Sequence, residues 1–195
     1  MQRIINITTV ITALLVLQSF TVMAFGETEK QKYRVVRSYD EFEVRFYPSA
    51  ILATVYSDAE SYRDLANPGF RKLAGYIFGG NESETKISMT SPVHMDMDEA
   101  SMSFVMPSSY TEESLPAPDD PSVKLERSAD VYVAAIRFGG YASDKDIAMY
   151  SEKLRSLLAG QGIEWYGSFR YLGYNPPFQP FGRRNEVIVN VKWTE

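Results

Sequence analysis

The chain of 195 residues carries 20 Lys and Arg against 25 Asp and Glu, a formal net charge of −5, and 45% of its residues are hydrophobic. An acidic chain without a basic stripe is not suited to nucleic acid, so we expect no nucleic-acid partner. The chain has no cysteine and a single histidine, which excludes disulfides, thiolate chemistry and zinc sites of the usual kind.

The N-terminal segment has the composition of a signal peptide. Arg3 gives it a positive start, an apolar stretch follows from Val10 to Met23, and small residues around Ala24 suit cleavage. We therefore predict a signal peptide over residues 1–24 and export of the mature chain, to the periplasm or out of the cell, without stable membrane insertion. The alternative is an uncleaved membrane anchor over residues 4–24, which is just long enough to span a bilayer.

Strand and helix patterns then follow in two similar halves. Alternating apolar and polar residues predict strands, and apolar residues spaced three and four apart predict helices. In the first half these patterns predict strands over 39–47, 50–55, 86–97 and 101–106, and a helix that follows Asn67-Pro68 and stops at 79–81. After a loop with four prolines at 107–122, they predict a strand over 131–138, a helix over 145–158 and strands over 167–174 and 185–193.

The order strand–helix–strand–strand thus occurs twice, with a period of about 80 residues. Two such units pair their sheets into one curved body with a helix for each half. We predict an α+β fold in which two pseudo-repeats form a distorted β-barrel flanked by two helices. A single domain over 33–195, acting as a monomer, is the expected organisation.

Two segments are candidates for a binding site. The helix carries an apolar stripe of Phe70, Leu73, Ala74 and Ile77, although packing on a sheet would satisfy this stripe without a ligand. The segment 174–187 holds three prolines together with two aromatic and two cationic side chains: Phe178, Phe181, Arg183 and Arg184. A loop stiffened by proline loses little entropy on binding, so it suits a flat apolar ligand that carries carboxylates.

Strand alternation separates the neighbouring side chains of these segments. Only one of Arg183 and Arg184 can face a ligand on a given side, and the other is expected to bond a carboxylate or carbonyl elsewhere. Glu186 is most simply a structural partner of the arginines. His94 falls on a polar face with Asp96 and is expected at the surface. The five methionines of 89–106 are expected to fill the core.

Several separated motifs of the chain resemble the SOUL family of haem-binding proteins. They are FRKLAGYIFGGN (70–81), KISMTSPV (86–93), LPAPDDPSV (115–123), FGGYAS (138–143) and YNPPFQPFGRRNEV (174–187). The resemblance covers the chain from Tyr33 to Trp193 and implies a two-repeat distorted barrel with two helices. It also implies non-covalent binding of haem or another porphyrin, with weak or absent axial ligation, between the first helix and the loop before the last strand.

Carried onto this sequence, the resemblance implies a binding site of Phe70, Arg71, Leu73, Ala74, Ile77, Phe178, Gln179, Phe181 and Arg183. Family members carry basic residues near the positions of Asn67 and Gln179, which are uncharged here, so the propionates would be met by Arg71, Arg183 or Arg184. No metal-ligand set or catalytic constellation is visible, and a non-enzymatic haem carrier for capture, buffering or transfer is the expectation. Two alternatives stay open. One is a module for other flat ligands, as in effector-binding domains of multidrug-responsive regulators, and the other is a hydrolase that uses Glu186.

Overall fold

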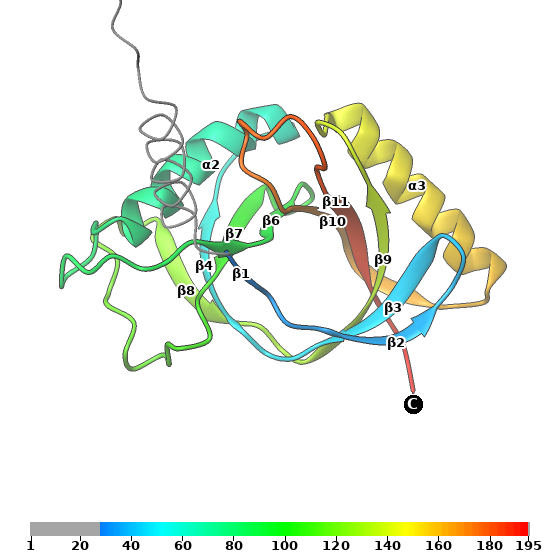
Figure 1. Cartoon of the computed structure of the whole chain (residues 1–195), viewed down its shortest axis with the longest axis horizontal. Helices are drawn as coiled ribbons and strands as arrows, with labels where there is room; N and C mark the ends of the chain where they lie inside the picture. Colours follow the sequence, from blue (N-terminus) through cyan, green and yellow to red (C-terminus); the bar gives the residue numbers. More distant parts are fainter. Residues whose placement is uncertain (1–27, 195) are drawn as a thin grey trace, which may run out of the picture.

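The structure of the protein, a computed structural model, describes residues 28–194 (Figure 1). The predicted signal peptide at 1–24 and the alternative anchor at 4–24 lie outside the described residues. The helices are α2 (Tyr62–Ile77) and α3 (Asp144–Gly160). The strands are β1 (Glu29–Lys30), β2 (Arg34–Ser38), β3 (Phe42–Tyr47), β4 (Ile51–Tyr56), β5 (Thr90–Ser91), β6 (Val93–Asp96), β7 (Ser101–Val105), β8 (Val123–Arg127), β9 (Val131–Phe138), β10 (Trp165–Gly173) and β11 (Asn185–Val191). Within residues 28–194, no helix is long and apolar enough to cross a bilayer.

The main sheet confirms the internal repeat. Its nine strands lie in the order β2-β3-β9-β11-β10-β6-β7-β4-β8, and all of their pairings are antiparallel. The triplet β9-β11-β10 and the triplet β4-β7-β6 have the same internal order, each belongs to one strand–helix–strand–strand unit, and the two units meet where β10 pairs with β6. A separate parallel pair, β1 with β5, holds the N-terminal end of the described chain.

Two bent segments curve this sheet back on itself. The pairing of β3 with β9 continues without a change of register into the pairing of β4 with β8, from Phe42 opposite Ile136 to Val55 opposite Val123. Where both segments bend, the backbone N–H of Ala50 donates to Ser128 Oγ at 3.0 Å. The two ends of the sheet are therefore joined by continuous chain, while β2 and β8 remain its edges. This is the predicted α+β fold, a distorted barrel that hydrogen bonds do not close.

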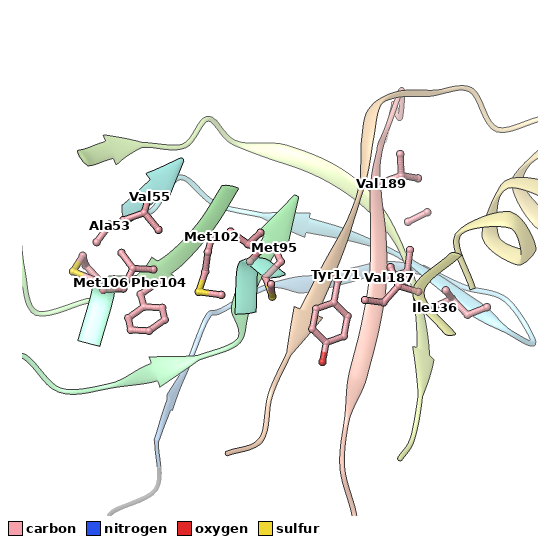
Figure 2. Packing of buried hydrophobic residues seen from close by; sticks show 14 of the residues in the cluster. Ala53, Val55, Met95, Met102, Phe104, Met106, Ile136, Tyr171, Val187 and Val189 are labelled. Carbon is pink, nitrogen blue, oxygen red and sulfur yellow. The ribbon is translucent and has the colours of Figure 1, made fainter. Parts of the chain in front are cut away.

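The apolar core lies between the outer face of the sheet and the two helices. Figure 1 shows α2 and α3 on the outside of the curve, and α2 packs on β4 and β7 while α3 packs on β9 and β11. Figure 2 shows the side chains that fill this layer from both repeats, among them Ala53, Val55, Met95, Met102, Phe104, Met106, Ile136, Tyr171, Val187 and Val189. All five methionines of 89–106 belong to it or pack against it, which confirms their prediction as core residues.

The structure corrects two of the predicted elements and adds strands that were not predicted. The strand expected over 86–97 is broken into β5 and β6, because Pro92 between them cannot donate to a ladder. Helix α2 begins at Tyr62, before the Asn67-Pro68 pair, since the Ser61 side chain caps it by accepting from the Asp64 N–H at 3.1 Å. The edge strands β2 and β8 were not expected. Both are short and largely exposed, so they carry little hydrophobic alternation.

Candidate ligand-binding surface

Helix α2 presents apolar side chains to solvent on the side away from the core. The side chains of Phe70 and Phe78 are 40% and 64% exposed, and Ala74 lies between them. Spacings of four residues place all three on one helical face. Arg71 is exposed beside Phe70. We call this face, with the exposed aromatic residues of the loop at 174–184, the aromatic surface.

The other two predicted helix residues lie beneath this surface. Leu73 is completely buried and Ile77 is 1% exposed, both in the core between α2 and the sheet. Phe70 bridges the two layers, because its ring meets the buried ring of Phe104 edge-on at 5.3 Å between centroids. Leu73 and Ile77 therefore hold the helix in place, and Phe70, Arg71 and Ala74 are the predicted helix residues that a ligand could contact directly.

The loop between β10 and β11 displays its two phenylalanines. Phe178 and Phe181 are 73% and 84% exposed. Beneath them Gln179 braces the loop, since its Oε1 accepts from Asn175 Nδ2 at 3.0 Å and its Nε2 donates to the Phe181 carbonyl at 3.0 Å. The prolines and this small network fix an exposed apolar tip, which is unfavourable in water unless a partner covers it.

Arg183 is committed to the shape of this loop. Its Nη1 donates to the carbonyls of Pro176 at 2.7 Å and Gln179 at 2.9 Å, and its guanidinium lies 4.4 Å from the ring centroid of Tyr141. Tyr141 in turn donates to the Pro177 carbonyl at 3.2 Å. The Nε–H of Arg183 is buried and has no hydrogen-bond partner among residues 28–194. Arg183 therefore has few N–H donors left for the predicted contact with a ligand carboxylate.

The base of the loop lies against the beginning of α2. The ring of Tyr62, in the first turn of α2, meets the ring of Tyr171 on β10 at 5.1 Å, and the Tyr171 hydroxyl donates to Asn185, the first residue of β11, at 2.7 Å. The Tyr62 N–H also donates to Asp144, in the first turn of α3, at 2.6 Å. Figure 1 shows the loop between these two helix starts. Phe70 lies two turns further along α2, about 12 Å from Tyr62 at 1.5 Å per residue.

On the inner face of the sheet, Glu186 is enclosed by two arginines. Arg45 donates to both of its carboxylate oxygens, at 2.7 and 3.1 Å, and Arg184 donates to Oε1 at 2.8 Å. Tyr174 donates to Oε2 at 2.9 Å. Burial alone would raise the pKa of Glu186, but the hydrogen bonds and charges of Arg45 and Arg184 bring it below its ordinary value. The predicted role of Glu186 as a structural partner of the arginines is confirmed.

His94 also lies on the inner face, which corrects its predicted place at the surface. It is half-buried, and its Nε2 is 2.8 Å from Gln31 Oε1. Burial, and next the charge of Arg170, lower its pKa to about 3. The alternation of β6 was predicted correctly, since Met95 is in the outer core, but the polar face opposite Met95 is the inside of the curve. His94 is thus on the other face of the sheet from α2.

Three residues important to these arrangements were not predicted. Phe78 could have been found, because Phe70, Ala74 and Phe78 continue one helical face with a spacing of four. No sequence pattern indicated the roles of Tyr141 and Arg45. Each acts on a residue far away in the chain, Tyr141 on Pro177 and Arg45 on Glu186, and their pairing depends on the tertiary structure.

Comparison with known proteins identifies the family. Residues 28–190 match the SOUL heme-binding protein family, so the chain belongs to it. Heme-binding protein 1 of Mus musculus is 30% identical over 177 residues, which cover 84% of this chain and 93% of the mouse protein. Heme-binding protein 2 of Homo sapiens is 30% identical over 156 residues, 75% of this chain and 76% of the human protein.

Solved structures share the fold at much lower identity. The C-terminal domain of EcmrR superposes with a TM-score of 0.57 at 10% identity, covering 79% of this chain and 98% of that domain. A hydrolase from Listeria innocua superposes with a TM-score of 0.53 at 15% identity, covering 80% of this chain and 94% of the hydrolase. Among residues 28–194 no group of three or more His, Asp or Glu is arranged to hold a metal ion.

Proposed function

We propose that the protein binds haem or a related porphyrin non-covalently on the aromatic surface, between the exposed face of α2 and the loop at 174–184. The family and the two heme-binding relatives support haem as the ligand. The observation that carries the location is the exposure of Phe70, Phe78, Phe178 and Phe181, of which Phe181 is 84% exposed. The braced loop keeps this apolar surface exposed to water. Binding of a flat apolar ligand removes the surface from water, which lowers the free energy.

The proposed binding has weak or no axial ligation. His94 is the only histidine of the chain, and its side chain lies on the face of the sheet opposite α2. The residues that fit the macrocycle are therefore aromatic rings, which stack on its faces. Arg71 is the exposed cation beside Phe70 and would meet a propionate, because Arg184 is engaged by Glu186 and Arg183 by loop carbonyls.

When bound, haem would supply the iron and its redox and ligand chemistry, while the chain supplies an apolar, partly open seat. An open seat of this kind favours rapid exchange over tight retention, which suits capture, buffering or transfer of haem without catalysis. We expect micromolar affinity, near −8 kcal/mol.

Haemin titration followed at the Soret band tests this proposal. In protein that begins at residue 25 we expect saturable one-to-one binding. Phe178→Ala should weaken the affinity roughly two- to tenfold, the range expected for loss of one aromatic contact. Tyr166→Ala is the matched control, because Tyr166 is a 47% exposed aromatic on β10 outside the aromatic surface. Equal, non-saturable binding by all three proteins would refute the site.

Export is a second part of the proposal. It is supported by the apolar segment at 1–24, which lies ahead of the family match that begins at residue 28. Intact mass and N-terminal sequencing of the protein recovered from cell fractions test it. A mature chain starting near residue 25 in the periplasmic or secreted fraction is expected, and an intact N-terminus in the membrane fraction would establish the anchor over residues 4–24 instead.

The environment of Glu186 supports neither a site for flat cationic ligands around this carboxylate nor the hydrolase. A carboxylate that attracts cationic ligands must have free lone pairs, but both oxygens of Glu186 accept from Arg45. General acid catalysis at neutral pH needs a raised pKa, and the pKa of Glu186 is lowered. We therefore retain the haem carrier as the proposed function.

A further inference from the structure

A polar hollow lies inside the curve of the sheet, away from the aromatic surface. Its volume is about 260 Å³, enough for on the order of ten water molecules. Inward-facing positions of six strands line it, and the residues that matter below are Thr54, His94, Ser103, Arg170, Asn190 and, at its opening, Glu99 and Glu126.

One cation, Arg170, is among the residues that line the hollow. Arg170 is half-buried, and no ion pair within 4.0 Å involves it in the part of the chain that the structure describes. Its one side-chain hydrogen bond goes from Nη2 to Asn190 Oδ1. Burial lowers the pKa of Arg170, and Asp96 and Glu99 act on it only from a longer distance. A guanidinium has five donors, so most of those of Arg170 are free to meet an anionic group.

Asp96 lies directly opposite Arg170 in the pairing of β6 with β10, and its charge raises the pKa of Arg170, but its oxygens accept hydrogen bonds from other donors. Asp96 is 7% exposed, and its Oδ1 accepts from the backbone N–H groups of Asp98 at 3.0 Å and Glu99 at 3.2 Å. Its Oδ2 accepts from Ser168 Oγ. Asp96 therefore holds the turn between β6 and β7. Three of its acceptor sites are occupied in this way, and none of the three bonds involves Arg170, which lines the hollow.

The other polar groups of the interior also have unused capacity. The Gln31 oxygen can only accept, so His94 Nε2 carries the proton and its Nδ1 keeps a lone pair. Thr54 and Ser103 share one hydrogen bond of 2.9 Å, which leaves one of the two hydroxyl protons for another acceptor. The hydroxyl of Tyr47 is buried and meets the distance and angle limits of a hydrogen bond with no group in the described part of the chain, although Arg45, Tyr174 and Arg170 lie close enough to interact with it electrostatically.

The opening of the hollow has the opposite charge. Glu99 and Glu126 are both exposed, and Glu126 accepts from the hydroxyl of the 47% exposed Tyr56 at 3.1 Å. A ligand that fits both parts carries an anionic group to reach Arg170 and a cationic group to remain near the two carboxylates. A simple anion is repelled at the entrance, and a simple cation leaves the free donors of Arg170 without an acceptor.

We propose that this hollow is a second binding site, for a small zwitterionic amino acid whose carboxylate meets Arg170 and whose ammonium meets Glu99 and Glu126. It lies on the inner face of the sheet, whereas the proposed haem site lies outside. The proposal does not depend on haem binding, and either can fail alone.

The single histidine provides the test. In the purified, untagged full-length chain, the ring signals of His94 in a ¹H–¹³C NMR spectrum are the only histidine signals. We would titrate 4-aminobutyrate, with butyrate and butylamine as probes that carry one charge each. Saturable shifts of the His94 signals are expected with 4-aminobutyrate, at least tenfold weaker binding with either single-charge probe, and unchanged haemin affinity.

Variants assign the two contacts. Arg170→Gln should weaken 4-aminobutyrate binding at least tenfold, and Glu126→Gln should weaken it severalfold. The control is Arg137→Gln, which removes an exposed arginine outside the hollow. If Arg170→Gln does not fold, as judged by circular dichroism, Arg170→Lys and Glu126→Gln still test the site. The proposal is overturned if 4-aminobutyrate leaves the His94 signals unchanged, if butyrate binds equally well, or if neither Arg170 nor Glu126 variants weaken binding.

Discussion

The chain uses arginines and aromatic rings in two regions with opposite results. Inside the sheet, Arg45 and Arg184 are 4% and 22% exposed, lie over the rings of Tyr33 and Tyr174, and satisfy a completely buried Glu186. On the aromatic surface the guanidinium of Arg183 donates to carbonyls of its own loop, and the rings of Phe178 and Phe181 face solvent. The first region is complete without a ligand, while the second leaves apolar area uncovered. Exposed apolar area therefore marks the binding surface better than the arginines do.

The largest effect that tests this comparison is expected inside the sheet. Glu186→Gln removes the charge that neutralises the buried Arg45, and loss of one partner of a buried pair costs about 3–5 kcal/mol of the free energy of unfolding. Urea unfolding followed by tryptophan fluorescence measures it. Glu164→Gln is the matched control, because its pair with Lys192 is exposed on both sides and no measurable loss is expected. Equal stability of the two variants would show that the cluster is not structural.

A comparable loss is expected beneath the aromatic surface. Leu73 is completely buried under α2, so Leu73→Ala should cost about 2–5 kcal/mol of the free energy of unfolding. Phe70→Ala, at a 40% exposed position three residues earlier in α2, should cost less stability and weaken haemin binding more. Urea unfolding of both variants measures which one loses more stability, and the Soret titration measures which one loses more haemin affinity. If Leu73→Ala weakened haemin binding more than Phe70→Ala, the ligand would not lie on the exposed face of α2. If Phe70→Ala cost more stability, the packing assigned to the two residues would be wrong.

A smaller effect separates two roles for Arg183. If its guanidinium braces the loop, Arg183→Lys should weaken haemin binding as much as Arg183→Ala does, by up to about tenfold, because an ammonium cannot reproduce its planar fork of donors. Haemin titration of both variants measures this. Retention of affinity by Arg183→Lys alone would show instead that the charge of Arg183 meets a propionate.

The smallest effect concerns pH and the inner face. The pKa of His94 is about 3 in the folded chain and about 6.5 in an unfolded one, so the unfolded state binds the extra proton. Its contribution to stability is present above pH 6.5 and falls with decreasing pH, by at most about 1.4 kcal/mol per pH unit. Between pH 6.5 and 5, His94→Gln should flatten the dependence of the free energy of unfolding on pH. An unchanged slope would mean that His94 charges freely in the folded chain.

Much of the fold followed from local patterns. The alternation of apolar and polar residues predicted that Met95 and His94, or Val187 and Glu186, lie on opposite faces, because successive side chains of a strand point in opposite directions. The repeated order of elements predicted two equivalent halves. The site was predicted less completely. The proline loop was recognised from its composition, but Leu73, predicted as a ligand contact, is buried, and Phe78, which was not predicted, is exposed. The stripe alone does not tell which side of a helix meets the sheet.

The sequence by itself therefore determined which side chains share a face, where the chain repeats and that the loop at 174–184 is stiff. Only the tertiary structure decided which faces are enclosed. The continuous pairing of 42–56 with 123–138 bends the sheet and turns a polar face, expected at the surface, into the inside that holds His94 and Arg170. It also brings Arg45 to Glu186 across 141 residues. Periodicity reports the direction of a side chain relative to its own strand, whereas enclosure depends on strands far away in the chain.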